Sequence, residues 1–445
     1  MAKAKKEAAL SPEEKLQAAL VPEEEQPYPL PENWCWTYMG VPIQWGSGGT
    51  PSRKNPNYFI GNIPWIKTGE LNNNIITQTE ESITQEAVSN SSAKLFPVNT
   101  VVIAMYGASI GKIGIMGVPA TTNQACACGI CSPAVNFKYL FYYSQSQKEA
   151  FINEGKGGAQ PNISQEIIKK HSFPFPPLPE QQRIVDKIES MFAKLDEAKE
   201  KAQAVVDSYE TRKAAILHKA FTGELTAKWR KENGVERSSW KKQRFDEVAL
   251  IRSNLVDPSD YQSFPHIAPD NIEKKSGILL EYRTVSEDKV TSGKHRFYPN
   301  QILYSKIRPY LSKVVVVDFD GLCSADMYPI EAIKNTKCLW YYMLSDEFLL
   351  QASTAGSRSV LPKINQKELS ALSVYLPIDE DEQAEIVRIL DDLFAKEQQV
   401  KEAAENVIEK IDLMKKAILA RAFRGELGTN DPKEERAAEL LKSVL

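Results

Sequence analysis

The sequence has few of the residues on which secreted, membrane-spanning and metal-dependent proteins rely. Its 445 residues include four histidines and six cysteines, and no uncharged apolar run reaches the ~18 residues that a membrane span needs. The N-terminal stretch lacks the apolar core of a secretory signal. Cysteines this sparse, in no even framework, are expected to be reduced thiols. We therefore expect a cytoplasmic protein without a membrane span.

A strong excess of positive charge is also missing. The chain has 55 lysines and arginines against 58 aspartates and glutamates, which gives a formal net charge of -3. This balance excludes a simple nucleic-acid packing protein, so any nucleic-acid surface must be local. A length of 445 residues exceeds one compact core and indicates roughly two to four domains.

Intact catalytic motifs are absent. Residues 107–112 resemble a phosphate-binding loop, but the motif is one residue short and Ile113 replaces the hydroxyl that would hold magnesium. Residues 55–58 resemble the catalytic tetrapeptide of adenine methyltransferases, but Asn57 replaces the second proline and no glycine-rich cofactor loop lies nearby. No histidine has the spacing of a metal site or a triad. We interpret the chain as non-catalytic, with no cofactor of its own.

One cysteine cluster has some of the character of a metal site. Cys126, Cys128 and Cys131 form a C-x-C-x-x-C pattern that is compatible with zinc ligation. Structural zinc sites usually need a second pair of cysteines or histidines, and none follows at a familiar spacing. Small buried thiols on a strand are the favoured interpretation, so no metal site is predicted.

The most prominent feature of the sequence is an internal duplication. A shift of 202 places aligns residues 181–225 with residues 383–427 without a gap, placing Gln181 on Gln383 and Phe221 on Phe423. A weaker match continues at an offset of 200 or 201, as Ile163 falls on Ile364. A period close to half the chain indicates a duplicated unit of one globular domain and one long helix.

The two repeated helices have the apolar spacing of a coiled coil. Apolar residues recur alternately every four and three positions, which is typical of a helix–helix seam. One charged residue interrupts each seam, Arg212 in the first and Glu397 in the second. If the helices pair antiparallel, these two residues meet and fix the register, but charges at a solvated edge would fit the pattern equally well. The predicted helix-pairing residues are Ile184, Ile188, Leu195, Arg212, Ile216, Phe221, Ile386, Leu390, Glu397, Ile411, Ile418 and Phe423, with Val400, Val407 and Met414 also on the second seam.

Local signals predict an α+β fold. We expect two mixed α/β domains separated by two long helices that form an antiparallel coiled coil, with a pseudo-twofold internal duplication. The predicted regions are an N-terminal tail with a short helix (1–32), a first domain (33–179), a long helix (180–235), a second domain (239–377), a second long helix (378–428) and a C-terminal tail helix (429–445). Strands are predicted near 100–105, 113–116, 279–282 and 314–317, and a helix near 138–151. Ser11, Pro12 and Glu14 predict a capped helix start, and Gly223 with the polar residues after it predicts the end of the first long helix.

Basic and polar loop residues occur at equivalent places in both halves. Residues 293–313 contain five lysines and arginines, no acidic residue and three tyrosines. Lysine and arginine bind phosphates, while arginine, asparagine and glutamine also read base edges. Each cluster alone is compatible with a solvated loop, but their recurrence favours binding. The predicted DNA-binding residues are Thr50, Ser52, Arg53, Lys54, Lys67, Tyr106, Ser109, Lys112, Gln160, Asn162, Asn254, Tyr304, Lys306, Arg308, Tyr310, Lys313, Arg358 and Lys363.

The repeated stretches PLPEQQRIVDKIESMFAKLDE with AAILHKAFTGELT, and LPIDEDEQAEIVRILDDLFAK with KAILARAFRGELG, closely resemble the conserved regions of type I restriction-modification specificity subunits. The loops SGGTPS, YGASIGKIG, GGAQPNIS and YSKIRPYLSK are similar to motifs of that family. The resemblance implies two target recognition domains, each reading half of a split DNA sequence, with the paired helices setting the gap.

The resemblance also implies partners. Two modification subunits would dock on the helices and supply the S-adenosylmethionine site, and restriction subunits would supply the ATP and magnesium chemistry. Three other functions stay open at this point. The chain could be an enzyme, such as a fused methyltransferase or nuclease, a coiled-coil adaptor without DNA contact, or the recognition part of a type IIB-like restriction-modification enzyme.

Overall fold

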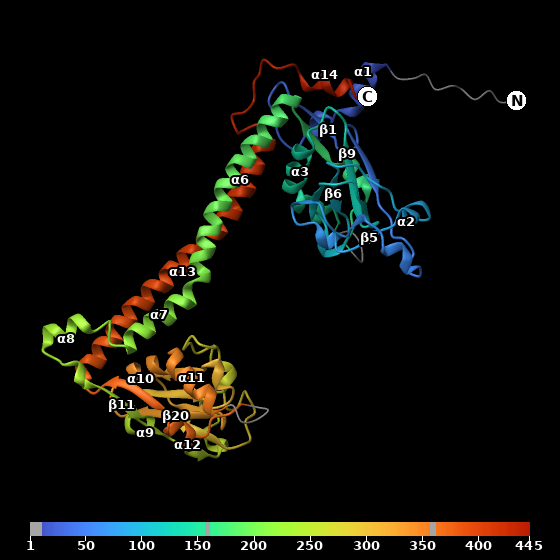
Figure 1. Cartoon of the computed structure of the whole chain (residues 1–445). Coiled ribbons are helices and arrows are strands. Elements are labelled where there is room, and N and C mark those ends of the chain that lie inside the picture. The colour runs from blue at the N-terminus through green and yellow to red at the C-terminus, as the bar shows by residue number, and fades with distance from the viewer. Residues whose placement is uncertain (1–10, 156–160, 357–361) are drawn as a thin grey trace. The chain divides into compact units, whose positions relative to one another are not determined.

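A computed structural model describes residues 11–155, 161–356 and 362–445, and its contacts divide the chain into two compact units (Figure 1). The first unit comprises Met1–Glu200 and Val407–Leu445, and the second comprises Lys201–Asn406. Each unit contains one globular domain and a segment of each long helical region. Each unit therefore combines one predicted domain with the helical segments on which it packs.

The first unit opens with α1 (Pro12–Ala19), which has the predicted capping box. The Ser11 hydroxyl accepts from the Glu14 amide at 3.2 Å, and the Glu14 carboxylate accepts from the Ser11 amide at 2.7 Å. The strands are β1 (Cys35–Tyr38), β2 (Ile43–Ser47), β3 (Ile63–Ile66), β4 (Asn74–Ile76), β5 (Ser82–Ile83), β6 (Val101–Ala104), β7 (Ile113–Met116), β8 (Thr121–Thr122), β9 (Cys126–Cys131) and β10 (Ser172–Phe175). The other short helices are α2 (Gln85–Ser89), α3 (Phe137–Ser146), α4 (Lys148–Glu154), α5 (Gln165–Lys170) and α14 (Ala437–Lys442), which lies beside α1 (Figure 1).

The second unit contains the other globular domain. Its strands are β11 (Trp240–Arg244), β12 (Ala249–Ile251), β13 (Leu255–Val256), β14 (Pro265–Ile267), β15 (Arg283–Thr284), β16 (Lys294–Phe297), β17 (Gln301–Ser305), β18 (Val314–Val317), β19 (Gly321–Cys323), β20 (Met327–Ala332) and β21 (Ser373–Pro377). Its short helices are α8 (Ala227–Asn233), α9 (Phe245–Val248), α10 (Thr336–Met343), α11 (Asp346–Ala355) and α12 (Gln366–Ser370). The predicted strand at 279–282 is wrong, since Leu279 forms only an isolated bridge with Ile272.

The two domains repeat the same sheet topology. The first has a mixed sheet in the order β2-β9-β6-β7-β4, and the second has equivalents of the first four of these strands, β12-β20-β17-β18, without a counterpart of β4. The small sheet β5-β3-β8 corresponds to β15-β14-β19, which the second domain extends with β16 and β13. The two-stranded pairs β1-β10 and β11-β21 correspond as well. The predicted duplication of the whole domain is therefore confirmed, although the aligned sequences have few identities.

An equivalent phenylalanine packs on each domain. Phe221 lies 5.1 Å from the ring of Tyr342 on α10, measured between centroids. Phe423 lies 5.3 Å from Tyr139 and 5.1 Å from Tyr143 on α3. Edge-on aromatic contacts of this kind stabilise cores beyond their buried area. Both phenylalanines, which were predicted as helix-pairing residues, are buried in the core of their own unit.

The long helical regions are α6 (Leu178–Asp207), α7 (Tyr209–Phe221) and α13 (Glu380–Phe423). The first predicted helix is thus interrupted at Ser208, whose hydroxyl bonds to the carbonyls of Ala204 at 2.6 Å and Val205 at 3.2 Å. Such bonds compete with the helical backbone pattern and bend helices. The helix then ends at Phe221, and the segment predicted to be non-helical after Gly223 forms α8. Among the described residues, no helix combines the length and the apolar character needed to cross a bilayer.

Most of the predicted seam residues are buried within the units. Ile184, Ile188, Ile386, Leu390, Ile411 and Ile418 are all buried, while Leu195 and Ile216 are partly buried. Three other seam positions are on the surface: Val400, Val407 and Met414 are 50%, 44% and 51% exposed. In the first unit the antiparallel pairing of α6 with α13 is held by Lys199 with Asp412 and by Lys415 with Asp196.

The predicted contact between Arg212 and Glu397 is confirmed. The guanidinium Nε lies 2.7 Å from Glu397 Oε2, and the two side chains are 32% and 23% exposed. Arg212 also donates to the carbonyl of Val205 and to the hydroxyl of Ser208, at the break between α6 and α7. The charged pair therefore lies where one helix changes direction. Its role in fixing the register remains a prediction.

We expect Arg212 and Glu397 to be coupled by about 0.5–1 kcal/mol, the value of a partly exposed ion pair. A double-mutant cycle with Arg212→Leu and Glu397→Leu, measured by urea unfolding, gives this number. If the double variant keeps both its helix register, probed by cysteine cross-linking across the pair, and its partner binding, the proposed register role is lost.

Each long helix begins with the same pair of polar contacts to its domain. The Gln181 side chain accepts from the Asn136 amide at 2.8 Å and donates to the carbonyl of Pro176 at 3.0 Å. Gln383 accepts from the Asn335 amide at 3.3 Å and donates to the carbonyl of Pro377 at 2.7 Å. Because the glutamines are identical and their partners equivalent, the sequence repeat preserves the joint between helix and domain.

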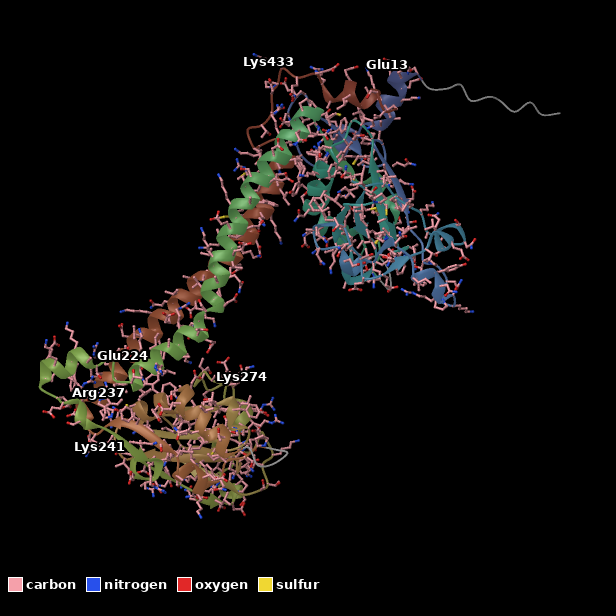
Figure 2. The ribbon with its side chains drawn as sticks, viewed as in Figure 1. Glu13, Glu224, Arg237, Lys241, Lys274 and Lys433 are labelled. Carbon is pink, nitrogen blue, oxygen red and sulfur yellow. The ribbon has the colours of Figure 1, made fainter. Side chains whose placement is uncertain are left out.

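The residue before each glutamine is a buried glutamate that binds the chain beyond the other helix. Glu180 accepts from the Thr429 hydroxyl at 2.6 Å, and Glu382 accepts from the Thr226 hydroxyl at 2.7 Å. Burial raises the pKa of Glu180. Figure 2 labels Arg237, whose guanidinium lies 5.5 Å from the ring of Trp240 beside the second of these sites. Each copy of the duplicated unit therefore has the same hydrogen bond, from a threonine hydroxyl to a buried glutamate at the start of its long helix.

Candidate nucleic-acid interface

In the first domain, the turn after β6 is held against the segment that precedes α5. The Gly107 amide donates to the carbonyl of Pro161 at 2.9 Å, and the Ile163 amide donates to the carbonyl of Met105 at 2.9 Å. Tyr106 and Asn162 form an isolated bridge in the same place. The structure thus brings together two loops that the sequence analysis assigned to DNA binding.

The second domain repeats this arrangement at the turn after β17. The Arg308 amide donates to the carbonyl of Pro362 at 2.8 Å, and the Ile364 amide donates to the carbonyl of Lys306 at 2.9 Å. An isolated bridge joins Ile307 to Lys363. We call this set of equivalent backbone hydrogen bonds the turn frame. It carries different side chains in the two domains.

The frame contains two left-handed backbone positions. In the first domain they are glycines, Gly107 with φ +60° and Gly111 with φ +74°. In the second domain they are Arg308 with φ 47° and Ser312 with φ 46°. A residue with a Cβ is strained in this region, and such strain is concentrated at functional sites. Arg308 therefore occupies a backbone position that glycine would adopt with less strain.

Several predicted residues of the first domain are on its surface. Thr50, Ser52, Lys54, Tyr106 and Asn162 are exposed, and Ser109 and Lys112 are partly exposed beside the turn after β6. The Thr50 hydroxyl bonds to the side chain of Gln124.

Two cations of the first domain are already paired. Arg53 lies 2.6 Å from Glu81 and 4.1 Å from the ring centroid of Phe59. Lys67 lies 2.7 Å from Glu80 and 3.2 Å from Glu81. Hydrogen bonds to these carboxylates raise the pKa of Lys67. Their charge is compensated within the domain, and their role in DNA binding remains a prediction.

The second domain exposes more of its predicted residues at the turn. Arg308 and Tyr310 are exposed, and Lys306 is partly buried with its Nζ 5.0 Å from the ring centroid of Tyr328. Burial, and then the nearby Lys363, lower the pKa of Lys306. Asn254 is exposed as well, at the edge beside β16.

Two predicted contacts of the second domain are corrected. Tyr304 is 1% exposed and belongs to the core, because it lies on the fully buried strand β17 and packs on Phe348. Lys313 is mostly buried and donates to the carbonyl of Pro269 at 2.7 Å, so it supports a loop. Gln160 and Arg358 lie outside the described residues.

Two further residues of the second domain were not predicted as site residues. Arg296 lies over three aromatic rings, with its guanidinium 4.8 Å from the Tyr298 centroid. Asp326 is 3.2 Å from Lys363. The basic run at 293–313 contained the signal for Arg296. Asp326 lies outside this run, and an acidic residue is not a signal for contact with phosphates.

The cysteine cluster lies within the first domain. Cys126 and Cys128 are buried on β9 and Cys131 is partly buried, and burial raises the pKa of all three thiols. No group of three or more histidine, cysteine or carboxylate side chains in the described part of the chain is placed to hold a metal ion.

Comparisons with known proteins agree with this architecture. The sequence matches the family described as type I restriction modification DNA specificity domain over residues 42–206 and 238–410, one match for each half. It is 34% identical over 393 residues to the type I restriction enzyme EcoDI specificity subunit of Escherichia coli, covering 83% of this chain and 87% of the relative. It is 23% identical to the EcoKI specificity subunit of Escherichia coli strain K12, covering 89% and 90%.

Solved structures show the same fold. A chain from a study of complex assembly and conformational transition of the type I R-M system matches with a TM-score of 0.69 at 19% identity, over 90% of this chain and all of that chain. The HsdS subunit from Thermoanaerobacter tengcongensis matches with a TM-score of 0.60 at 20% identity, over 91% of this chain and all of that one.

Proposed function

The chain belongs to the family of type I restriction-modification DNA specificity subunits, and on this premise we propose that it selects the DNA sequence on which a type I restriction-modification complex acts. Each globular domain reads one half of a bipartite site, and the paired helices set the distance between the halves. Two modification subunits supply the methyltransferase with its S-adenosylmethionine, and restriction subunits supply the ATP- and magnesium-dependent steps. The chain itself contributes recognition and no catalytic residue.

The observation that carries this proposal is the repeated turn frame. Equivalent hydrogen bonds hold the turns after β6 and β17, while the side chains on them differ. Two domains that share a backbone turn but carry different side chains on it fit a DNA site whose two halves differ in sequence. Exposed arginine, lysine, tyrosine and asparagine on these turns are the residue types that contact phosphates and base edges.

The exposed apolar side chains of α13 support the docking of modification subunits. Val407 and Met414 are spaced seven residues apart, so in the first unit they lie along one stripe of the helix, and Val400 lies on the part of α13 that belongs to the second unit. About half of each is exposed. Because the other predicted seam residues are buried or partly buried inside the units, these exposed seam side chains are the ones that we assign to the partner.

Mapping methylated adenines across the genome of the native strain tests the proposed function. The expected result is one bipartite sequence whose methylation disappears when this chain is deleted and returns with its expression. Methylation or cleavage of DNA by the purified chain alone would establish an enzyme instead. A partner complex without sequence preference would establish an adaptor.

Replacing Arg308 with glycine is expected to separate stability from DNA binding. Glycine relieves the left-handed strain, so the free energy of unfolding rises by about 1 kcal/mol. Loss of the cation weakens DNA binding and lowers the slope of log affinity against log salt by about 1. Urea unfolding and DNA titrations of the complex at several salt concentrations measure the two effects.

Lys274→Gly is the matched control, because Lys274 is also an exposed cation of the second domain but lies in another loop. An unchanged salt slope in the Arg308 variant would remove Arg308 from the interface.

A further inference from the structure

One carboxylate occupies the turn frame of the second domain. The Lys306 amide donates to the carbonyl of Asp326 at 3.0 Å, so the residues before β20 and after β17 are held together by the backbone. The Ser324 hydroxyl accepts from the Asp326 amide at 3.2 Å and fixes the turn from which the side chain leaves. The position of Asp326 is thus set by main-chain bonds and does not depend on its own side chain.

Two lysines flank this carboxylate. Lys363 Nζ lies 3.2 Å from Asp326 Oδ1, and both side chains are 46% exposed. Lys306 lies beside this ion pair, because its amide is bonded to the carbonyl of Asp326. Two lysines and one carboxylate therefore lie together at this turn, with the exposed Arg308 two residues after Lys306.

The first domain has the same frame without these charges. The Met105 amide donates to the carbonyl of Ala125 at 2.8 Å, as Lys306 does to Asp326. The Asn162 amide donates to Gly155 at 3.2 Å, as the Lys363 amide does to Gly356 at 3.0 Å. Met105, Ala125 and Asn162 therefore stand where the second domain has Lys306, Asp326 and Lys363. Because the backbone is shared, the fold does not require the carboxylate.

We propose that Asp326 is a specificity-determining residue of the second domain, and that its carboxylate accepts a hydrogen bond from the exocyclic amino group of a cytosine or an adenine. This inference rests on the proposed function. A carboxylate is repelled by the phosphates that attract Lys363 and Arg308, so on a DNA-facing turn it needs a donor. In the major groove, the donors are cytosine N4 and adenine N6. Lys363 offsets the repulsion between this carboxylate and the DNA backbone.

The experiment uses the full-length chain assembled with its modification subunits and a pool of DNA duplexes randomised across the bipartite site. Methylated duplexes are selected and sequenced. Asp326→Ala copies the first domain and is expected to reduce the preference at one base pair by about 10-fold to 100-fold, the range for loss of one specific base contact. Preference at all other positions stays unchanged. The base pair affected, C·G or A·T, identifies the donor.

Three further variants distinguish recognition from support. Lys363→Gln is expected to lower the yield for every sequence while keeping the preference at that base pair. Asp320 is an exposed carboxylate in the loop that follows β18, and Asp320→Ala is expected to change no preference. Asp326→Val has a side chain of similar size without a hydrogen-bond acceptor, so it provides the same readout if the alanine variant does not assemble.

The outcomes separate the inference from the proposed function. If the wild-type complex selects a bipartite sequence and both Asp326 variants keep its preference at every position, or lose it evenly over all positions, the inference is wrong and the proposed function stands. If the wild-type complex selects no sequence, the proposed function fails and the inference fails with it.

Discussion

Replacing Glu382 by alanine is expected to lower the free energy of unfolding of the second unit by about 3–5 kcal/mol, the cost of leaving one partner of a buried ion pair alone. The carboxylate is fully buried and accepts from Thr226 at 2.7 Å, Arg230 at 2.5 Å and Trp240 at 2.9 Å. Arg230 is 7% exposed and would remain buried without its counter-charge. Hydrogen exchange of amides 226–244 in urea measures the loss.

Asp381→Ala is the matched control for this substitution. Asp381 is the preceding residue and is exposed in the first turn of α13, so its removal costs at most about 1 kcal/mol of helix-dipole interaction. Glu382→Gln should fall between the two variants, since an amide oxygen still accepts hydrogen bonds but does not neutralise Arg230. A loss below 1 kcal/mol in Glu382→Ala would show that Arg230 finds water when the carboxylate is absent.

The helices were the most predictable part of the fold because their signal is periodic. Apolar spacing identified α6, α7 and α13, and the matching breaks in that spacing were sufficient to place Arg212 opposite Glu397. The interruption at Ser208 was not predictable, because a serine in a helix usually points to solvent and bends it only when its hydroxyl bonds back to the carbonyls.

The candidate interface was predicted in location but less well in its residues. The turns after β6 and β17 were identified from basic loops. Tyr304 was wrongly included, because the sequence of the turn does not show where β17 ends, and this side chain is buried on that strand. Arg53 and Lys67 were predicted to bind DNA, and their contacts with Glu81, 28 and 14 residues away in the chain, were not predicted. Such partners are brought together only by the tertiary fold.

Exchanging residues 33–177 for the corresponding segment of a relative with a different target is expected to change one half of the methylated sequence and leave the other half and the spacing intact. The segment ends before α6, so Ile184 and Ile188, which pack on the first domain, are kept. Phe423, which packs on Tyr139 and Tyr143, also remains. The donor must therefore carry aromatic residues at the two tyrosine positions for the new domain to seat.

The reciprocal exchange of residues 239–377 is the matched control and should change only the other half. Its donor needs an aromatic residue to meet Phe221 in place of Tyr342. Together the two chimaeras assign each domain to one half-site, and they show which half the Asp326 variants should affect. If either chimaera assembles and methylates the original sequence, that domain does not read DNA. If both do, recognition resides in a partner subunit and the chain acts as an adaptor.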